Sequence, residues 1–148
     1  MSTKKTITVG FTCGSFDLCH YGHHLMFEEA KSQCDYLLVG LQTDPTIDRK
    51  DTKNKPIQNM EERLGQLKAC KYIDGIVVYN TEEELLDYLT RSVDHIDVRF
   101  VGADWRGKEF TGYELPIPVI FNKRDHEYST SYLRTRVVDA AGDQVKAK

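Results

Sequence analysis

Apolar positions follow two periods along the chain, and the two periods alternate. Alternating apolar residues from Ile7 to Phe11 predict a first strand, which ends in a glycine turn at 13–15. Apolar residues at helical spacing then predict a helix from Tyr21 to about Lys31. Short apolar runs predict four further strands, at 36–41, 76–79, 98–101 and 118–121.

Capping residues mark the starts of three more helices. Asn59 with Glu62, and Thr81 with Glu84, have the spacing of capping boxes, so helices are expected from about 60 to 71 and after Thr81. A Ser/Thr cap predicts a last helix from about Thr130 to Ala140, with a glycine stop at 142. The residues expected to bury the helix after Thr81 are Leu85, Leu86, Leu89 and Val93.

This alternation of strands and helices predicts an α/β fold. We expect a single Rossmann-like domain over residues 1–142, in which helices cover both faces of an open, parallel sheet of about five strands. Residues 143–148 are expected to form a polar C-terminal tail. Ligands of such sheets bind at the carboxyl ends of the strands, so the loops after the strands are the candidate sites.

The segment between the second strand and the helix at 60 differs from the rest of the chain. Residues 43–59 are polar and follow no hydrophobic period. Compact domains rarely contain an unstructured loop longer than about 12–15 residues unless it serves binding or closure. A lid or binding segment is therefore favoured here over plain disorder.

Composition narrows the functional classes. The 148 residues include 20 Lys and Arg against 23 Asp and Glu, and the resulting net charge of -3 argues against a general nucleic-acid binder. The apolar runs are too short to span a bilayer, and no apolar signal segment is seen at the start, so a cytoplasmic protein without membrane insertion is expected. The cysteines at 13, 19, 34 and 70 have no CxxC spacing and are expected to be reduced thiols.

The loop after the first strand carries the strongest chemical signal. His20 and His23 lie one turn apart at a predicted helix start, with Gly22 between them. Free backbone amides, the positive end of the helix dipole and two imidazoles suit a phosphate group. Local hydrogen bonding of the histidines, or a zinc site with His24 or Cys19, is the alternative; His95 and His126 are expected at the surface.

Four segments in the same order resemble one enzyme family. Phe16-Asp17-Leu18 followed by His20-Tyr21-Gly22-His23 is similar to the HxGH signature of the nucleotidylyltransferase superfamily, in the form of its cytidylyltransferase branch. The other segments are 62–63 with 71–74, 101–108, and Arg124 with 128–131. The likeness extends from about 8 to 139 and is greatest to glycerol-3-phosphate cytidylyltransferases.

The resemblance implies a reaction. A small alcohol phosphate, glycerol 3-phosphate above all, would attack the α-phosphate of CTP in line and give a CDP-alcohol and pyrophosphate, feeding the synthesis of envelope polymers. Mg²⁺ would be bound through the triphosphate, with no direct protein ligand. The resemblance also implies a homodimer, with Tyr36 or Tyr72 as contacts.

The resemblance further implies roles for individual residues. His20 and His23 would be catalytic, stabilising the α-phosphate. The nucleotide would be bound by Gly14, Ser15, Phe16, Asp17, Asp104, Trp105, Arg124, Ser129 and Thr130. The phosphates or the acceptor would be bound by Lys53, Lys55, Arg63 and Lys71.

Two other functions remain open at this point. One is an adenylyltransferase of the same superfamily that uses ATP, and the other is a nucleotide-binding module without turnover. The intact histidine pair favours an enzyme. Ala103, Lys71 and the segment 125–128 depart from the family pattern, and these departures bear on the acceptor more than on the nucleotide.

Overall fold

The computed structural model describes residues 7–144 of the chain, with side chains up to residue 142. Five strands form one sheet: β1 (Val9–Gly14), β2 (Tyr36–Gln42), β3 (Gly75–Tyr79), β4 (Val98–Val101) and β5 (Val119–Phe121). Every neighbouring pair is parallel, and the order across the sheet is β3-β2-β1-β4-β5. The predicted α/β class and the parallel sheet are confirmed.

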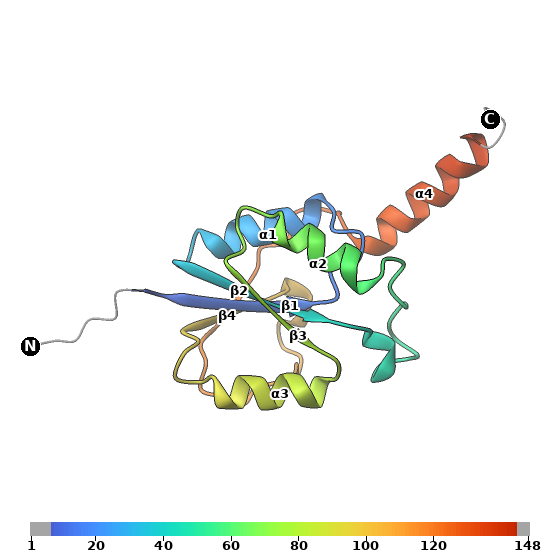
Figure 1. Ribbon diagram of the computed structural model, residues 1–148. Helices are drawn as coiled ribbons and strands as arrows, with labels where there is room; N and C mark the ends of the chain where they lie inside the picture. The colour runs from blue at the N-terminus through green and yellow to red at the C-terminus, as the bar shows by residue number, and fades with distance from the viewer. Residues whose placement is uncertain (1–6, 145–148) are drawn as a thin grey trace, which may run out of the picture.

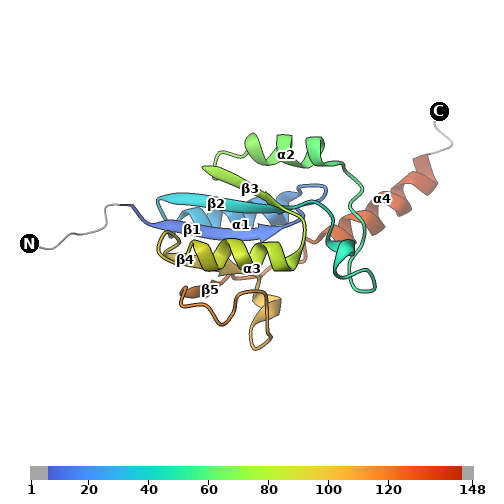
Figure 2. The same ribbon diagram turned by 60° about the horizontal axis from the view of Figure 1, so that its bottom comes forward.

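Helices cover both faces of the sheet (Figures 1 and 2). Helices α1 (Tyr21–Lys31) and α2 (Met60–Lys68) lie on one face, and α3 (Glu82–Arg91) lies on the other. Helix α4 (Thr130–Gln144) starts at the carboxyl edge of the sheet and projects away from it. Short 3₁₀ helices, η1 (Pro45–Ile47) and η2 (Ala103–Trp105), follow β2 and β4.

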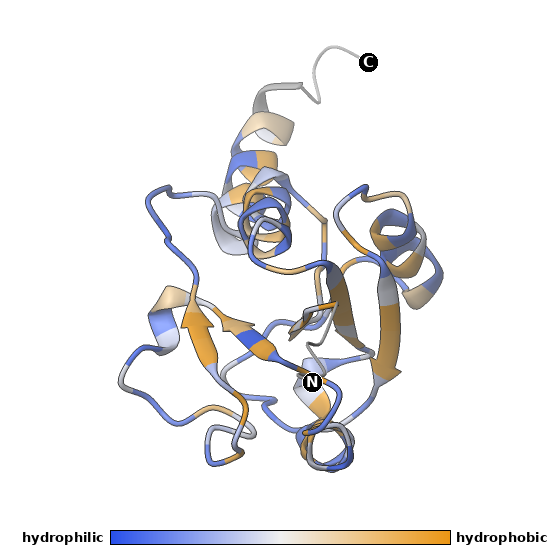
Figure 3. Cartoon of the chain, turned by 90° about the vertical axis from the view of Figure 1, so that its left-hand side faces the viewer, coloured by the Kyte–Doolittle hydropathy of each residue, from blue (hydrophilic) through white to orange (hydrophobic). Residues whose placement is uncertain are grey.

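The two-residue period of the strands divides the core into two layers. Leu37, Val39 and Phe100 pack with α1 and α2, whereas Phe11 and Tyr79 pack with α3. Figure 3 shows apolar residues concentrated in the strands and alternating with polar ones along the helices. Because the core faces are filled, ligand space is left at the ends of the strands.

Capping at the helix starts agrees with the sequence prediction. The Asn59 side chain accepts from the Glu62 amide at 2.9 Å, and the Glu62 carboxylate accepts from the Asn59 amide at 3.0 Å. At α3, Thr81 accepts from the Glu84 amide, but the Glu84 carboxylate turns to the amide of Asn80 instead. Both helices therefore begin where expected.

Two details of the helices correct the prediction. Leu86 is 42% exposed, because Leu85 and Leu89 form the inward face of α3 and Leu86 lies one residue around the helix from it. Helix α4 passes through Gly142 to Gln144, so this glycine does not end it. Positive φ values among the described glycines occur at Gly107 and Gly112, so Gly142 lacks the left-handed conformation of a helix stop. The rest of the predicted tail, 145–148, lies outside the described residues.

The strand order places a switch point beside the central strand. The chain passes from β1 to β2 on one side and later returns to β4 on the other. Loops leaving β1 and β4 therefore diverge at the carboxyl edge, which is where open parallel sheets bind ligands. Across residues 7–144, no helix is both long and apolar enough to cross a membrane.

Candidate active site

Two adjoining cavities open at the carboxyl edge of the sheet. The first, the histidine cavity, has a volume of about 260 Å³. Its lining includes His20, His23, Arg124, Ser129 and Thr130. The second, the arginine cavity, has a volume of about 340 Å³ and is lined by Arg49 and Arg99 among others. Gly102, at the end of β4, lines both cavities.

The β1–α1 loop holds the histidines in a defined orientation. His20 caps α1, and its Nδ1 accepts from the Gly22 amide at 3.0 Å. The His23 Nδ1 in turn accepts from the His20 amide at 3.2 Å. Since both Nδ1 atoms accept backbone hydrogen bonds, both neutral rings carry their proton on Nε2. The pair therefore has two Nε2–H donors, of which that of His20 lies 3.2 Å from Thr130 Oγ1.

Burial keeps the pair neutral. The rings stack with their centroids 3.9 Å apart, and the edge of Phe16 packs against His23. Burial, followed by the proximity of His20, lowers the pKa of His23 to about 3. Burial also lowers the pKa of His20, with a further contribution from His126. Neutral donors can bind phosphate oxygens over the whole physiological pH range.

Two helix N-termini converge on the same cavity. The His20 Nε2 and the Thr130 Oγ1 are 3.2 Å apart, which joins the first turn of α1 to that of α4. Ser129 caps α4 by accepting from the Tyr132 amide at 3.0 Å. Both helix dipoles thus point their positive ends at one place, an arrangement that attracts an anion.

Gly22 permits this approach of the helices. A Cβ atom at this position would lie 2.8 Å from the Cβ of Tyr128 and 2.9 Å from the His20 ring. Both distances are shorter than side chains tolerate. The loop before the helix is also strained, because Phe16 and Leu18 have positive φ angles of 48° and 55°. Phe16 itself is buried behind His23, so its side chain supports the ring.

Asp17 connects the histidine loop to the long loop at 43–59. Its carboxylate accepts from the amides of Ile57 and Gln58 at 2.8 and 2.9 Å, and from Arg134 Nη2 at 3.1 Å. Arg134, on α4, also donates to the carbonyl of Lys55. The Asp17 carboxylate therefore holds the histidine loop, the long loop and α4 together.

The long loop is folded rather than featureless. It contains η1, and Asp48 accepts from the amide of Glu82 at the start of α3. Lys53 lines the arginine cavity together with Gly14, Ser15 and Trp105. These contacts agree with a binding segment at the carboxyl edge.

Of the remaining predicted residues, some lie at the site and others do not. Asp104 forms an ion pair with Arg124 beside the histidine cavity. Lys55 is largely exposed and lies 3.8 Å from Asp44. Lys71 lies past the end of α2 with its amine over the Tyr72 ring. Neither Lys55, Lys71 nor Arg63 is among the residues that line the two cavities.

Arg63 was expected to bind the phosphates or the acceptor, but in the structure its guanidinium donates hydrogen bonds to backbone carbonyls. It is 2% exposed and donates to the carbonyls of Ser15, Gln42, Thr43 and Gln58. Three of these carbonyls belong to the loops after β1 and β2, and that of Gln42 is at the last residue of β2. Arg63 therefore positions both loops, a role that its place on an amphipathic helix did not indicate.

Several residues of the site were not found from the sequence. His126 was expected at the surface, yet it is half-buried and lines the histidine cavity. Arg49, Glu82 and Arg99 of the arginine cavity were also missed. Arg99 had a detectable signal, because it is a charge within the apolar run of β4.

The geometry disfavours both a reactive cysteine and the zinc alternative at His24 and Cys19. All four cysteines lie within residues 7–144 and are free. Burial raises the pKa of Cys13, and burial followed by Cys70 raises the pKa of Cys19 to about 11, so neither is a thiolate at neutral pH. His24 lies between Cys19 and Cys70, but no metal-binding group of three such side chains is found among the described residues.

We expect the fold to lose stability in acid because of His23. The unfolded imidazole takes up a proton below about pH 6.5 and the folded one only near pH 3, so the free energy of unfolding falls as pH falls through this window. By pH 5 the loss from this group is about 2 kcal/mol. Urea unfolding of the wild type and His23→Asn at pH 7 and pH 5 measures it. Parallel losses in the two proteins would contradict the assignment to His23.

Comparison with known proteins agrees with this geometry. Residues 11–136 match the family described as cytidylyltransferase-like. The bifunctional protein HldE of Campylobacter concisus is 31% identical over 146 residues, covering 99% of this chain and 30% of that protein. HldE of Hyphomonas neptunium is 34% identical over 105 residues, covering 66% and 22%. The chain thus spans less than a third of these curated relatives.

A solved structure shares the fold. The lipopolysaccharide core biosynthesis protein from Thermoplasma volcanium superposes with a TM-score of 0.65 at 21% identity. The match covers 81% of this chain and 99% of that one. At this level of identity the likeness supports the architecture, and the site must be argued from its own residues.

Proposed function

The chain belongs to the cytidylyltransferase-like family, and from this premise we propose that it transfers CMP from CTP to a small alcohol phosphate. One observation carries the proposal. Two neutral histidines with fixed Nε2–H donors face the point where the N-termini of α1 and α4 meet. This is a site for a phosphate group whose negative charge increases during reaction.

The reaction needs no protein nucleophile. An oxygen of the acceptor phosphate forms a new bond to the α-phosphorus, the bond from that phosphorus to the bridging oxygen breaks, and pyrophosphate leaves with the electron pair. His20 and His23 donate hydrogen bonds to the α-phosphate oxygens, and the α4 amides and Arg124 hold the outgoing phosphates. Catalysis then rests on positioning and charge stabilisation.

We propose that Mg²⁺ is held by the nucleotide, where it would neutralise charge on the leaving phosphates. The carboxylates nearest the histidines already have partners. Asp17 accepts from two amides and Arg134, and Asp104 is paired with Arg124. Such groups are better suited to ordering the loops than to ligating the ion.

Asn122 supports the choice of an amino-bearing base. Its side chain is 6% exposed and lines the histidine cavity, and its Oδ1 has no hydrogen-bond partner among the described residues. A buried acceptor of this kind costs free energy until a donor reaches it. The exocyclic amine of cytosine is such a donor, and uracil offers none in its place.

For the acceptor we propose glycerol 3-phosphate or a similar small phosphate of envelope carbohydrate synthesis. The name of the Thermoplasma neighbour places that protein in lipopolysaccharide core biosynthesis, which supports this choice.

The homodimer is also proposed, on the resemblance alone. Tyr36 is 39% exposed, whereas the Tyr72 hydroxyl is bonded to Glu28, which makes Tyr36 the better contact.

We expect pyrophosphate release with Mg²⁺, CTP and one member of a panel of alcohol and sugar phosphates. Release should equal the CDP-alcohol formed, stop without acceptor and fail with UTP. ATP is the second nucleotide of the assay, and turnover with ATP alone would overturn the choice of CTP. Nucleotide binding without turnover across the panel would contradict the enzyme and favour a binding module.

A further inference from the structure

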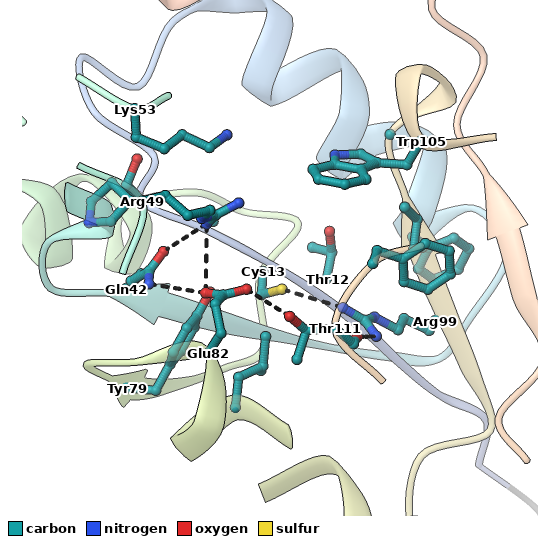
Figure 4. Close-up of a pocket in the computed structure, with 18 of the residues that line it drawn as sticks. Thr12, Cys13, Gln42, Arg49, Lys53, Tyr79, Glu82, Arg99, Trp105 and Thr111 are labelled. Carbon is teal, nitrogen blue, oxygen red and sulfur yellow. Dashed lines mark hydrogen bonds and ion pairs between the residues drawn. The ribbon is translucent and has the colours of Figure 1, made fainter. Parts of the chain in front are cut away.

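The arginine cavity contains charged side chains that the transfer step does not use. Figure 4 shows Arg49 and Lys53 on one side, Trp105 and Arg99 on the other, and Glu82 between them. The volume of about 340 Å³ lies at the lower end of the range of small-molecule sites. This is room for a small organic molecule next to the histidine cavity.

Arg99 is a buried cation without a full set of partners. It is 5% exposed, in the middle of β4, and its side chain lies on the α3 face of the sheet. It donates to the carbonyl of Thr111 and lies 3.8 Å from the Cys13 sulfur, with the guanidinium over the Phe110 ring. Among the described residues its buried Nε has no acceptor. A buried guanidinium is costly unless its donors are used, so a ligand oxygen is the natural partner.

Arg49, on the long loop, is a second cavity arginine with an unused donor. Its Nη2 lies 3.4 Å from Gln42 Oε1 and 3.5 Å from Glu82 Oε2, while its buried Nε has no acceptor among residues 7–144. Glu82 also accepts from Gln42 Nε2 at 3.0 Å and from Thr111 Oγ1 at 2.8 Å. These contacts hold the Arg49 guanidinium and the Glu82 carboxylate in fixed positions at the arginine cavity.

The charge of the cavity disfavours a cationic occupant. Arg49, Lys53 and Arg99 face two carboxylates, Glu82 and Glu109. Burial raises the pKa values of Cys13 and Tyr79, so these groups stay neutral at pH 7 and add no negative charge. The Phe110 face that the Arg99 guanidinium covers is not free for an ammonium group.

We propose that the arginine cavity binds the body of the acceptor, and that Arg99 with Arg49 selects hydroxyl-rich phosphates, of polyols or sugars, over phosphates that carry an ammonium group. This inference rests on the proposed function. Guanidinium donors and the Glu82 carboxylate together bind hydroxyl oxygens and hydroxyl protons, and the excess positive charge repels an ammonium head. Gly102 links this space to the α-phosphate site.

The test compares Arg99→Met and Arg49→Met with Arg91→Met, which removes an arginine on the exposed surface of α3. The assay is the CTP reaction with glycerol 3-phosphate and a hexose 1-phosphate against phosphoethanolamine and phosphocholine. We expect the wild type to use hydroxyl-rich acceptors, and each cavity variant to raise the acceptor KM by about tenfold to a hundredfold. The KM for CTP should stay unchanged, and Arg91→Met should behave as wild type.

Each outcome decides between the alternatives. Equal use of phosphocholine by the wild type, or an unchanged acceptor KM in Arg49→Met and in folded Arg99→Met, overturns the inference and leaves the proposed function standing. If no acceptor turns over, the proposed function fails instead, and calorimetry with the same hydroxyl-rich phosphates decides the inference. Binding that is lost in Arg99→Met and retained in Arg91→Met supports the cavity; no binding, or equal binding, overturns it.

Discussion

Replacing His23 with asparagine should lower kcat by about a hundredfold to a thousandfold, the effect of removing one preorganised donor from a site of developing charge. The Nε2–H of His23 is held in place by the bond that its Nδ1 accepts from the His20 amide. A donor fixed in this way costs no reorganisation when the α-phosphate becomes pentacoordinate. Because the gain is made in the transition state, CTP binding should change far less than kcat.

Asparagine separates the two functions of the His23 ring. Its Oδ1 occupies nearly the position of Nδ1 and can accept from the His20 amide, but it has no atom at the position of Nε2. His23→Asn should therefore remain folded and bind CTP while losing turnover, which single-turnover kinetics and calorimetry would show. His95→Ala is the matched control, since His95 is exposed, follows the end of α3 and is not among the residues that line the histidine cavity. Full activity in His23→Asn would remove His23 from the mechanism.

The strands and most helices could be predicted because local signals agreed with the tertiary environment. The four residues 98–101 were assigned to a strand from their apolar run, and β4 has those bounds. The start of α1 at Tyr21 was predicted from spacing alone, and the structure places it there. The prediction of the end of α4 failed, because the helical pattern and the glycine at 142 are competing signals. Gly142 costs a helix only about 1 kcal/mol, which is too little to end it without a left-handed stop.

The site was predictable where a motif carried the chemistry. The spacing of His20 and His23 indicated a phosphate site, and the structure adds the hydrogen bonds that fix both tautomers. His126 and Arg134 could not be assigned, because each acts through a segment more than a hundred residues away in the chain. Residue type and local spacing do not specify such contacts, which depend on the tertiary arrangement that brings the start of α4 beside the β1–α1 loop.

Arg63 shows the same limit in energetic terms, and Arg63→Leu should lower the free energy of unfolding by about 3–5 kcal/mol. The substitution keeps the apolar stem of the side chain but leaves the carbonyls of Ser15, Gln42, Thr43 and Gln58 without their donor. A buried carbonyl that loses its partner costs about 1–3 kcal/mol. The bond to the Gln42 carbonyl is buried, and the other three are part-buried, so water can replace the arginine only at those three. The loops after β1 and β2 should then separate, so the KM for both substrates should rise as well.

Chemical denaturation of Arg63→Leu beside Arg63→Lys and Arg91→Leu tests this account. Lysine retains the charge and can still donate to some of the carbonyls, so it should recover part of the loss, whereas a phosphate-binding role would make it nearly equivalent in stability to the wild type. Arg91 forms an exposed pair with Asp87 at 2.9 Å, and its removal should cost less than about 1 kcal/mol. A wild-type midpoint for Arg63→Leu, with only the KM changed, would return Arg63 to the phosphate site. A large loss of stability would instead establish it as the residue that holds both catalytic loops together.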